Sequence, residues 1–175
     1  MARQLILLIG DDATLAHQWE HFPALKSAVW IGGVSPHFSA QPHFPFSKSK
    51  NLLGSEFPAL IYDGRQGIHL DALAIAAGAL SEGGILLLLF NDWQDLAVQP
   101  DGDSLRWSGE KHPINTPHFI AFLQEKSKNT AFPFINICRP RWSSLGLKRR
   151  FQNYINRPWN KPIYCGKWRH PVQRC

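Results

Sequence analysis

Residues 59–90 contain the pattern that most constrains the fold, two continuous apolar runs separated by an alanine-rich segment. The first run is Ala59-Leu-Ile-Tyr62, the second is Ile85 to Phe90, and residues 70–77 between them are LDALAIAA. Apolar runs without polar alternation predict strands that are buried on both faces, and the alanine-rich segment predicts a helix. Such a unit joins parallel strands through a right-handed crossover. We therefore predict a three-layer, Rossmann-like α/β domain with a mostly parallel sheet.

Five more elements are predicted around this unit. Gln4–Ile9 is another apolar run and predicts a buried strand, and residues 11–14 offer N-capping side chains for a helix to about residue 21. Residues 27–31 predict a short strand. Thr116-Pro117 predicts a helix that begins with Thr at the N-cap and extends to about residue 126, and a last strand follows at 132–137. The segments 34–50 and 91–117 are predicted to be long loops.

Charge divides the chain near residue 130. Residues 1–130 carry 9 Lys and Arg against 13 Asp and Glu, whereas residues 131–175 carry 10 Lys and Arg and no acid. Such asymmetry is typical of a nucleic-acid-binding arm, and equally of the end of a globular unit. We expect two parts, a Rossmann-like domain at residues 1–138 and an irregular basic tail at residues 139–175.

The longest apolar run, Ile85 to Phe90, is too short to span a bilayer. The N-terminal sequence reaches Asp11 and Asp12 too early for a secretory signal. Three cysteines, all of them within residues 131–175, give no complete disulfide framework. We expect a soluble, cytoplasmic protein without a membrane partner.

Three separated stretches resemble one known family. They are LLGSEFPALIYDGRQGIHLDALAIAAGALSEGGILLLL at 52–89, QPDGDSLRW at 99–107 and TPHFIAFL at 116–123. In order, spacing and loop content, the chain over about residues 4–141 resembles the N-terminal domain of bacterial tRNA(Met) cytidine acetyltransferase, of the RNA cytidine acetyltransferase family. This resemblance implies a place in a multidomain enzyme that uses acetyl-CoA, with ATP or GTP hydrolysis. The enzyme acetylates the N4 amine of the wobble cytidine in elongator methionine tRNA.

In that family the N-terminal domain precedes a helicase-like P-loop NTPase domain, an acetyltransferase domain and a tRNA-binding region. A P-loop needs G-x-x-x-x-G-K-[ST] to hold phosphate and magnesium, and this motif is absent from the sequence. Gly166-Lys167 is followed by Trp168 instead of Ser or Thr. We therefore assign no catalytic and no cofactor-binding residue, and expect the chain to be inactive alone. Its expected partners are tRNA and the NTPase and acetyltransferase domains.

Cations and aromatic residues are interleaved through the basic tail, a composition that suits phosphate contacts and base stacking. The candidate RNA-binding residues are Arg139, Arg141, Lys148, Arg149, Arg150 and Arg157. The alternatives are a solvated tail or a truncated or frameshifted start of the NTPase domain. Three functional hypotheses follow: a scaffolding or RNA-positioning module without chemistry of its own, a stand-alone RNA-binding adaptor, and a non-functional truncated remnant.

Two motifs resemble metal sites. Residues 17–21 spell H-x-x-E-H, a zinc motif of metalloproteases, but a third ligand and a cleft would also be needed. Cys165, His170 and Cys175 match the last three ligands of a zinc knuckle, whose first ligand would fall on Pro162. We favour an amphipathic surface helix for the first and coincidence for the second, and assign no metal ligand.

Two polar loops follow predicted strands. Residues 63–67, DGRQG, lie at the carboxyl end of a strand, where open α/β sheets bind ligands. Asp101 and Asp103 lie in the second loop and could join a polar site with Arg106. Neither loop offers a nucleophile together with its base, so we favour structural turns over a catalytic site.

Overall fold

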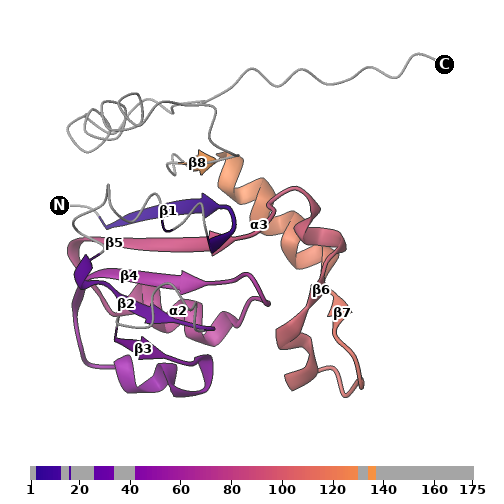
Figure 1. Ribbon diagram of the computed structural model, residues 1–175, viewed down its shortest axis with the longest axis horizontal. Coiled ribbons are helices and arrows are strands. Elements are labelled where there is room, and N and C mark those ends of the chain that lie inside the picture. The colour runs from indigo at the N-terminus through magenta and orange to yellow at the C-terminus, as the bar shows by residue number, and fades with distance from the viewer. Residues whose placement is uncertain (1–2, 13–15, 17–25, 34–41, 130–133, 137–175) are drawn as a thin grey trace, which may run out of the picture.

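The computed structural model describes residues 3–12, 16, 26–33, 42–129 and 134–136. Its centre is a six-stranded sheet with the order β3-β2-β4-β5-β1-β8, in which every neighbouring pair is parallel (Figure 1). The strands are β1 (Gln4–Ile9), β2 (Val29–Ile31), β3 (His43–Phe44), β4 (Phe57–Asp63), β5 (Leu80–Phe90) and β8 (Phe134–Asn136). The predicted α/β fold with a mostly parallel sheet is confirmed.

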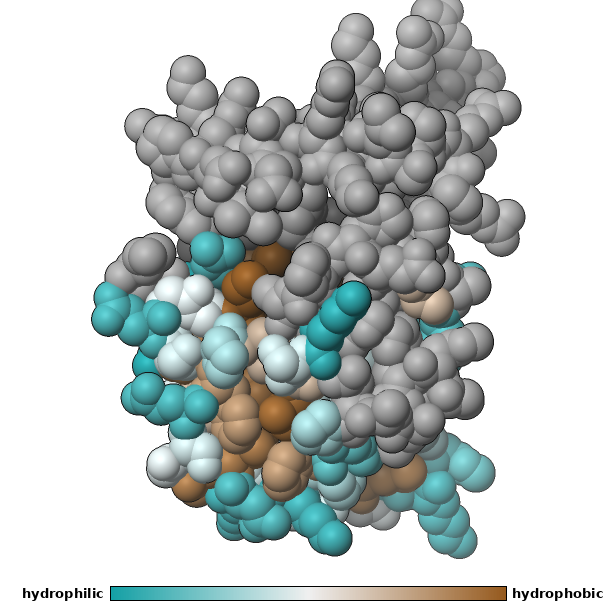
Figure 2. Space-filling view, turned by 60° about the vertical axis from the view of Figure 1, so that its left-hand side comes forward, coloured by the Kyte–Doolittle hydropathy of each residue, from teal (hydrophilic) through white to brown (hydrophobic). Residues whose placement is uncertain are grey.

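The sheet is apolar on both faces, because successive residues of its central strands alternate between two buried clusters. In β4, Leu60 and Tyr62 belong to the cluster that packs against η3 (Phe46–Leu52), α2 (Leu70–Gly78) and α3 (Pro117–Asn129). Ile61 belongs to the cluster on the opposite face, where Ala16 packs. Figure 2 accordingly shows hydrophobic residues gathered in the middle of one side of the molecule, bordered by hydrophilic residues.

The strand-helix-strand unit forms as predicted, with α2 joining the parallel strands β4 and β5. One boundary was wrong, since β5 begins at Leu80 and not at residue 85. Leu80 pairs with Phe57, the register shifts between residues 57 and 59, and Gly83 has a φ of 72°. Strand pairing therefore extends β5 through Gly83 and Gly84.

The segment 34–50 is not one long loop, because it contains β3 and the start of η3. Backbone pairing with β2 fixes β3, and the His43 ring contacts the Gly32 carbonyl oxygen at 2.6 Å. Phe46 at the start of η3 packs on Tyr62 with ring centroids 5.2 Å apart. These tertiary contacts have no counterpart in local periodicity, which explains why the sequence pattern missed them.

The predicted loop at 91–117 also contains structure. It includes η4 (Asp95–Val98), then β6 (Pro100–Asp101), η5 (Gly102–Arg106) and β7 (Ile114–Asn115). β6 and β7 pair in an antiparallel manner, and we call residues 99–116 the hairpin segment. Figure 1 shows it beside the carboxyl ends of β4 and β5, next to the β4–α2 loop (residues 64–69).

The helix predicted from residue 117 and the last predicted strand are confirmed as α3 and β8. The helix predicted for residues 11–21 and the basic tail lie almost entirely outside the described residues. Within the described part of the chain, no helix is both long enough and apolar enough to cross a membrane.

Replacement of Leu60 by Ala should destabilise the protein by about 2–5 kcal/mol, because Leu60 is fully buried in β4 and its loss leaves a cavity. Urea unfolding of the full chain measures this change. Leu53→Ala is the matched control, since Leu53 is 63% exposed and its truncation should change stability by less than about 0.5 kcal/mol. Equal effects of the two substitutions would contradict the assignment of the core.

Candidate functional site

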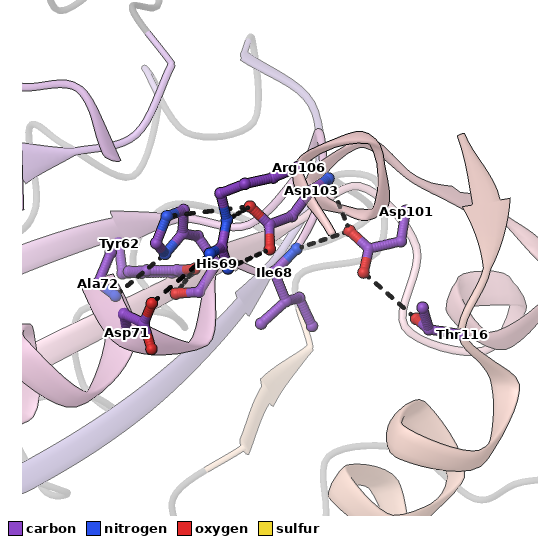
Figure 3. Close-up of polar contacts among 9 residues, drawn as sticks. All are labelled: Tyr62, Ile68, His69, Asp71, Ala72, Asp101, Asp103, Arg106 and Thr116. Atoms are coloured by element: carbon purple, nitrogen blue, oxygen red, sulfur yellow. Dashed lines mark hydrogen bonds and ion pairs between the residues drawn. The ribbon is translucent and has the colours of Figure 1, made fainter. Parts of the chain in front are cut away.

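Asp101 joins the hairpin segment to the β4–α2 loop (Figure 3). Its Oδ1 accepts hydrogen bonds from the backbone N–H groups of Ile68 and Asp103, both at 3.1 Å. Its Oδ2 accepts a hydrogen bond from Thr116 Oγ1 at 3.4 Å. One carboxylate therefore gathers donors from three places in the chain, and hydrogen bonds to a charged acceptor are stronger than those between neutral groups.

Asp103 is the centre of the charged contacts beside α2. Nε and Nη2 of Arg106 donate to its two oxygens at 3.1 and 3.0 Å, and this pairing raises the pKa of Arg106. Nη1 of Arg106 lies 3.7 Å from Oδ2 of Asp71, in the first turn of α2. His69 Nε2 lies 3.9 Å from Asp103 Oδ1. Both oxygens of Asp103 are thus engaged by one guanidinium, in the fork geometry that favours such pairs.

His69 fixes the start of α2. Its Nδ1 accepts the N–H of Ala72 at 3.2 Å, and its carbonyl oxygen accepts the Tyr62 hydroxyl at 3.0 Å. Burial raises the pKa of Tyr62 far above its ordinary value and nearby carboxylates raise it further, so the phenol keeps its proton and donates. Because Nδ1 is an acceptor, the neutral imidazole carries its hydrogen on Nε2, which faces Asp103.

Two glycines allow the backbones of the β4–α2 loop and the hairpin segment to meet. Gly67 has a φ of 142°, and a Cβ there would lie 2.5 Å from Asp101 Oδ1. The N–H of Gly102 donates to the Gln66 carbonyl oxygen at 3.0 Å, and a Cβ on Gly102 would lie only 2.1 Å from that oxygen. Side chains at either position would separate the two segments.

Asp63, the last residue of β4, forms a second charged cluster with Arg65 and Asp12. Arg65 donates from Nε and Nη2 to the two oxygens of Asp63 at 2.8 and 2.7 Å, and its Nη1 donates to Asp12. The hydrogen bonds to Asp63 raise the pKa of Arg65 well above its ordinary value. The side chain of Asp63 is only 6% exposed, so its charge needs this partner.

The chemistry open to these clusters is limited by their mutual contacts. A general base or nucleophile needs a lone pair directed at a substrate and a pKa suited to proton transfer. Both carboxylate oxygens of Asp63, Asp101 and Asp103 already accept hydrogen bonds from the chain. Within the described residues, no group of three or more His, Cys, Asp or Glu is placed to hold a metal ion. The arrangement is suited to holding loops in place.

The two predicted polar loops do not merge into one site. Asp101, Asp103 and Arg106 do come together, as the sequence suggested, but the residues of the β4–α2 loop that they contact are Ile68 and His69. Several other candidates lie outside the described residues. They are the candidate RNA-binding cations, the H-x-x-E-H residues and the three cysteines. Their proposed roles therefore remain predictions.

Sequence reasoning missed five members of the clusters: Asp12, Tyr62, His69, Asp71 and Thr116. A usable signal existed for Asp12, because it follows β1, and the carboxyl ends of parallel strands share one edge of the sheet. A signal for Asp71 was its place in the first turn of a predicted helix, where acids are favoured. The contacts of Tyr62 and His69 depend on how β4 meets the first turn of α2, and the contact of Thr116 depends on the fold of the hairpin segment. Neither leaves a local sequence pattern.

Residues 1–134 match the family model described as tRNA(Met) cytidine acetyltransferase TmcA, N-terminal. The TmcA protein of Haemophilus influenzae is 52% identical over 90 residues, which cover 51% of this chain and 14% of that protein. The TmcA proteins of Yersinia pestis and Pectobacterium atrosepticum are 45% identical over 129 residues and 36% identical over 125 residues, each covering 71% of this chain and 18% of the relative. The chain therefore spans less than a fifth of the length of these curated relatives.

Replacement of Asp101 by Ala should cost on the order of 2–3 kcal/mol of stability, because the N–H groups of Ile68 and Asp103 lose a charged acceptor. Asp101→Asn should recover most of this loss, since its carbonyl oxygen still accepts from the backbone. Urea unfolding checks both variants against Asp95→Ala, the removal of an exposed carboxylate from the same region. If Asp101→Ala were no more destabilising than Asp95→Ala, Asp101 would not be holding the hairpin segment.

Proposed function

Because the chain belongs to the family of tRNA(Met) cytidine acetyltransferase N-terminal domains, we propose that it is a scaffolding or RNA-positioning module with no chemistry of its own. One observation carries the proposal. The charged side chains at the carboxyl edge of the sheet, where an α/β domain would place a ligand, are engaged with one another and with the backbone. They support loop geometry and leave acetyl transfer to other domains.

The proposed context is a longer enzyme that acetylates the N4 amine of the wobble cytidine in elongator methionine tRNA. Acetyl-CoA and ATP or GTP would be bound by its acetyltransferase and NTPase domains. The relatives named above are five or more times as long as the region they share with this chain, which leaves room for such domains in those proteins. We place the activity in the cytoplasm, with tRNA.

A second candidate function is RNA binding by the basic tail, in which the α/β domain would act as an adaptor. It is supported by the 10 Lys and Arg and the absence of acids in residues 131–175. Interleaved cations and aromatic residues suit single-stranded nucleic acid, with phosphate contacts from the cations and base stacking on the rings.

A domain exchange tests the scaffolding role. Residues 1–134 of this chain should support N4-acetylcytidine formation when they replace the matching domain of the Haemophilus influenzae relative. The relative without any such domain should be slower by roughly 10- to 100-fold, since misplaced domains lose substrate positioning. Mass spectrometry of digested methionine tRNA measures the product, and the 175-residue chain alone should form none. Product from the chain alone, or full activity without the domain, would refute the proposal.

The adaptor role predicts affinity for methionine tRNA that falls steeply with salt. Replacement of Lys148, Arg149 and Arg150 by Ala should reduce the slope of log affinity against log salt by about 2–3, since each phosphate contact releases a counterion. Filter binding of the full chain measures the slope. The matched control removes three exposed lysines of the domain, Lys26, Lys48 and Lys50, and should leave the slope nearly unchanged. An equal loss in both variants would indicate non-specific attraction, and salt-insensitive binding would rule out the role.

A further inference from the structure

The hairpin segment concentrates exposed apolar side chains. Seven large hydrophobic residues are exposed within the described part of the chain. Three of them lie on this segment, a fourth directly precedes it at residue 98, and the fifth, Leu70, is the neighbour of Asp71, which Arg106 approaches. We call these five residues the hairpin surface. Its members, with their exposed fractions, are Leu70 (47%), Val98 (68%), Leu105 (47%), Trp107 (53%) and Ile114 (37%).

Three residues of the hairpin surface, Leu105, Trp107 and Ile114, lie around one buried serine. Ser104 has no exposed area, its Oγ accepts the N–H of Ile114 at 2.9 Å, and its carbonyl oxygen accepts the N–H of Trp107 at 3.2 Å. Leu105 is the next residue in η5. Arg106 then reaches Asp71, the neighbour of Leu70 at the start of α2. Leu105, Trp107 and Ile114 thus belong to one local structure, and Arg106 connects it to the start of α2.

That local structure is pre-organised. Asp101 fixes the start of η5 to the β4–α2 loop, and the Gly102 N–H bonds to the Gln66 carbonyl oxygen. A surface that is already ordered loses little conformational entropy when a partner binds. Exposed apolar residues that are concentrated in one part of a monomer mark interaction sites more often than single scattered ones do.

The charge of this region favours a protein partner over RNA. Residues 91–116 contain five acids, which are Asp92, Asp95, Asp101, Asp103 and Glu110, against two cations, which are Arg106 and Lys111. Arg106 is paired with Asp103 and lies close to Asp71. Nucleic-acid surfaces need an excess of cations for the phosphates, so an acidic and apolar surface suits a partner with apolar residues bordered by Lys or Arg.

We propose that the hairpin surface is where this domain docks onto the remainder of a full-length enzyme of its family. The inference rests on the proposed scaffolding function. In the relatives, more than four-fifths of the polypeptide lies outside the matched region, so a covalently linked partner is present at high effective concentration. A large apolar contact would hold the domain in a fixed orientation, as positioning of a tRNA requires.

Hydroxyl-radical footprinting with mass spectrometry tests the docking, by comparing the full 175-residue chain with the domain-exchanged Haemophilus influenzae enzyme. Oxidation of Trp107 and Leu105 should fall at least about fivefold in the exchanged enzyme, because the core of an interface loses nearly all solvent contact. Leu53, 63% exposed and near the amino end of β4, is the internal control and should react equally in both proteins. Equal oxidation of Trp107 in both proteins would overturn the proposal.

A double variant, Leu105→Ala with Trp107→Ala, gives a second measurement. It should leave the melting temperature of the full chain nearly unchanged, since both side chains are exposed, yet slow the exchanged enzyme at least about tenfold relative to Leu53→Ala. If Trp107 becomes protected in the full chain alone as its concentration rises, or only when tRNA is added, the occupant is a second copy or RNA and the assignment is wrong.

The two proposals fail in different ways. If the exchanged enzyme acetylates tRNA while Trp107 stays reactive, the proposed scaffolding function is supported and docking through the hairpin surface is refuted. If Trp107 is protected but the relative keeps full activity without the domain, docking through the hairpin surface is supported and the scaffolding function is refuted.

Discussion

The pairing of β4 with β5, buried on both faces, is the constraint on which the rest of the structure depends. Leu60 and Ile61 are adjacent in sequence, point to opposite faces of the sheet and are both fully buried. A strand in this position tolerates charge only where it ends, because an unpaired buried charge is strongly destabilising. Asp63 ends β4, and Arg65 pairs with it two residues later. Polar chemistry is thereby confined to the edge of the sheet.

At that edge, the polar side chains bind backbone groups and one another, and so hold the loops in place. Asp101 accepts two backbone N–H groups, and the guanidinium of Arg106 binds both oxygens of Asp103. Catalytic groups are arranged differently, with donors and acceptors aimed at the place where a substrate will lie. Carboxylates, a histidine and arginines gathered at strand ends look like an active site. We attribute their grouping here to the attachment of the hairpin segment to the parallel sheet. Rigid attachment is also what a domain interface requires.

How far the sequence could predict the molecule depends on the range of the interactions. Continuous apolar runs predicted β1, β4 and β5, and Thr116-Pro117 predicted the start of α3, because burial on both faces and helix capping leave local patterns. The edge strand β3 and the hairpin segment were missed, since short elements held by distant contacts have no period. Of the polar clusters, the grouping of Asp101, Asp103 and Arg106 was foreseen. The role of His69 was not, because it depends on Tyr62 and on the first turn of α2.

Charge then distinguishes two parts of the sequence that a single net charge would conceal. The hairpin surface lies in a stretch with more acids than cations, so phosphate binding there would oppose the local field. Residues 131–175, by contrast, carry 10 Lys and Arg and no acid. If this domain contacts tRNA, electrostatics therefore favours contact through the basic segment, while the apolar hairpin surface remains available to protein. The proposed docking surface and the candidate RNA-binding cations would then lie in different parts of the sequence.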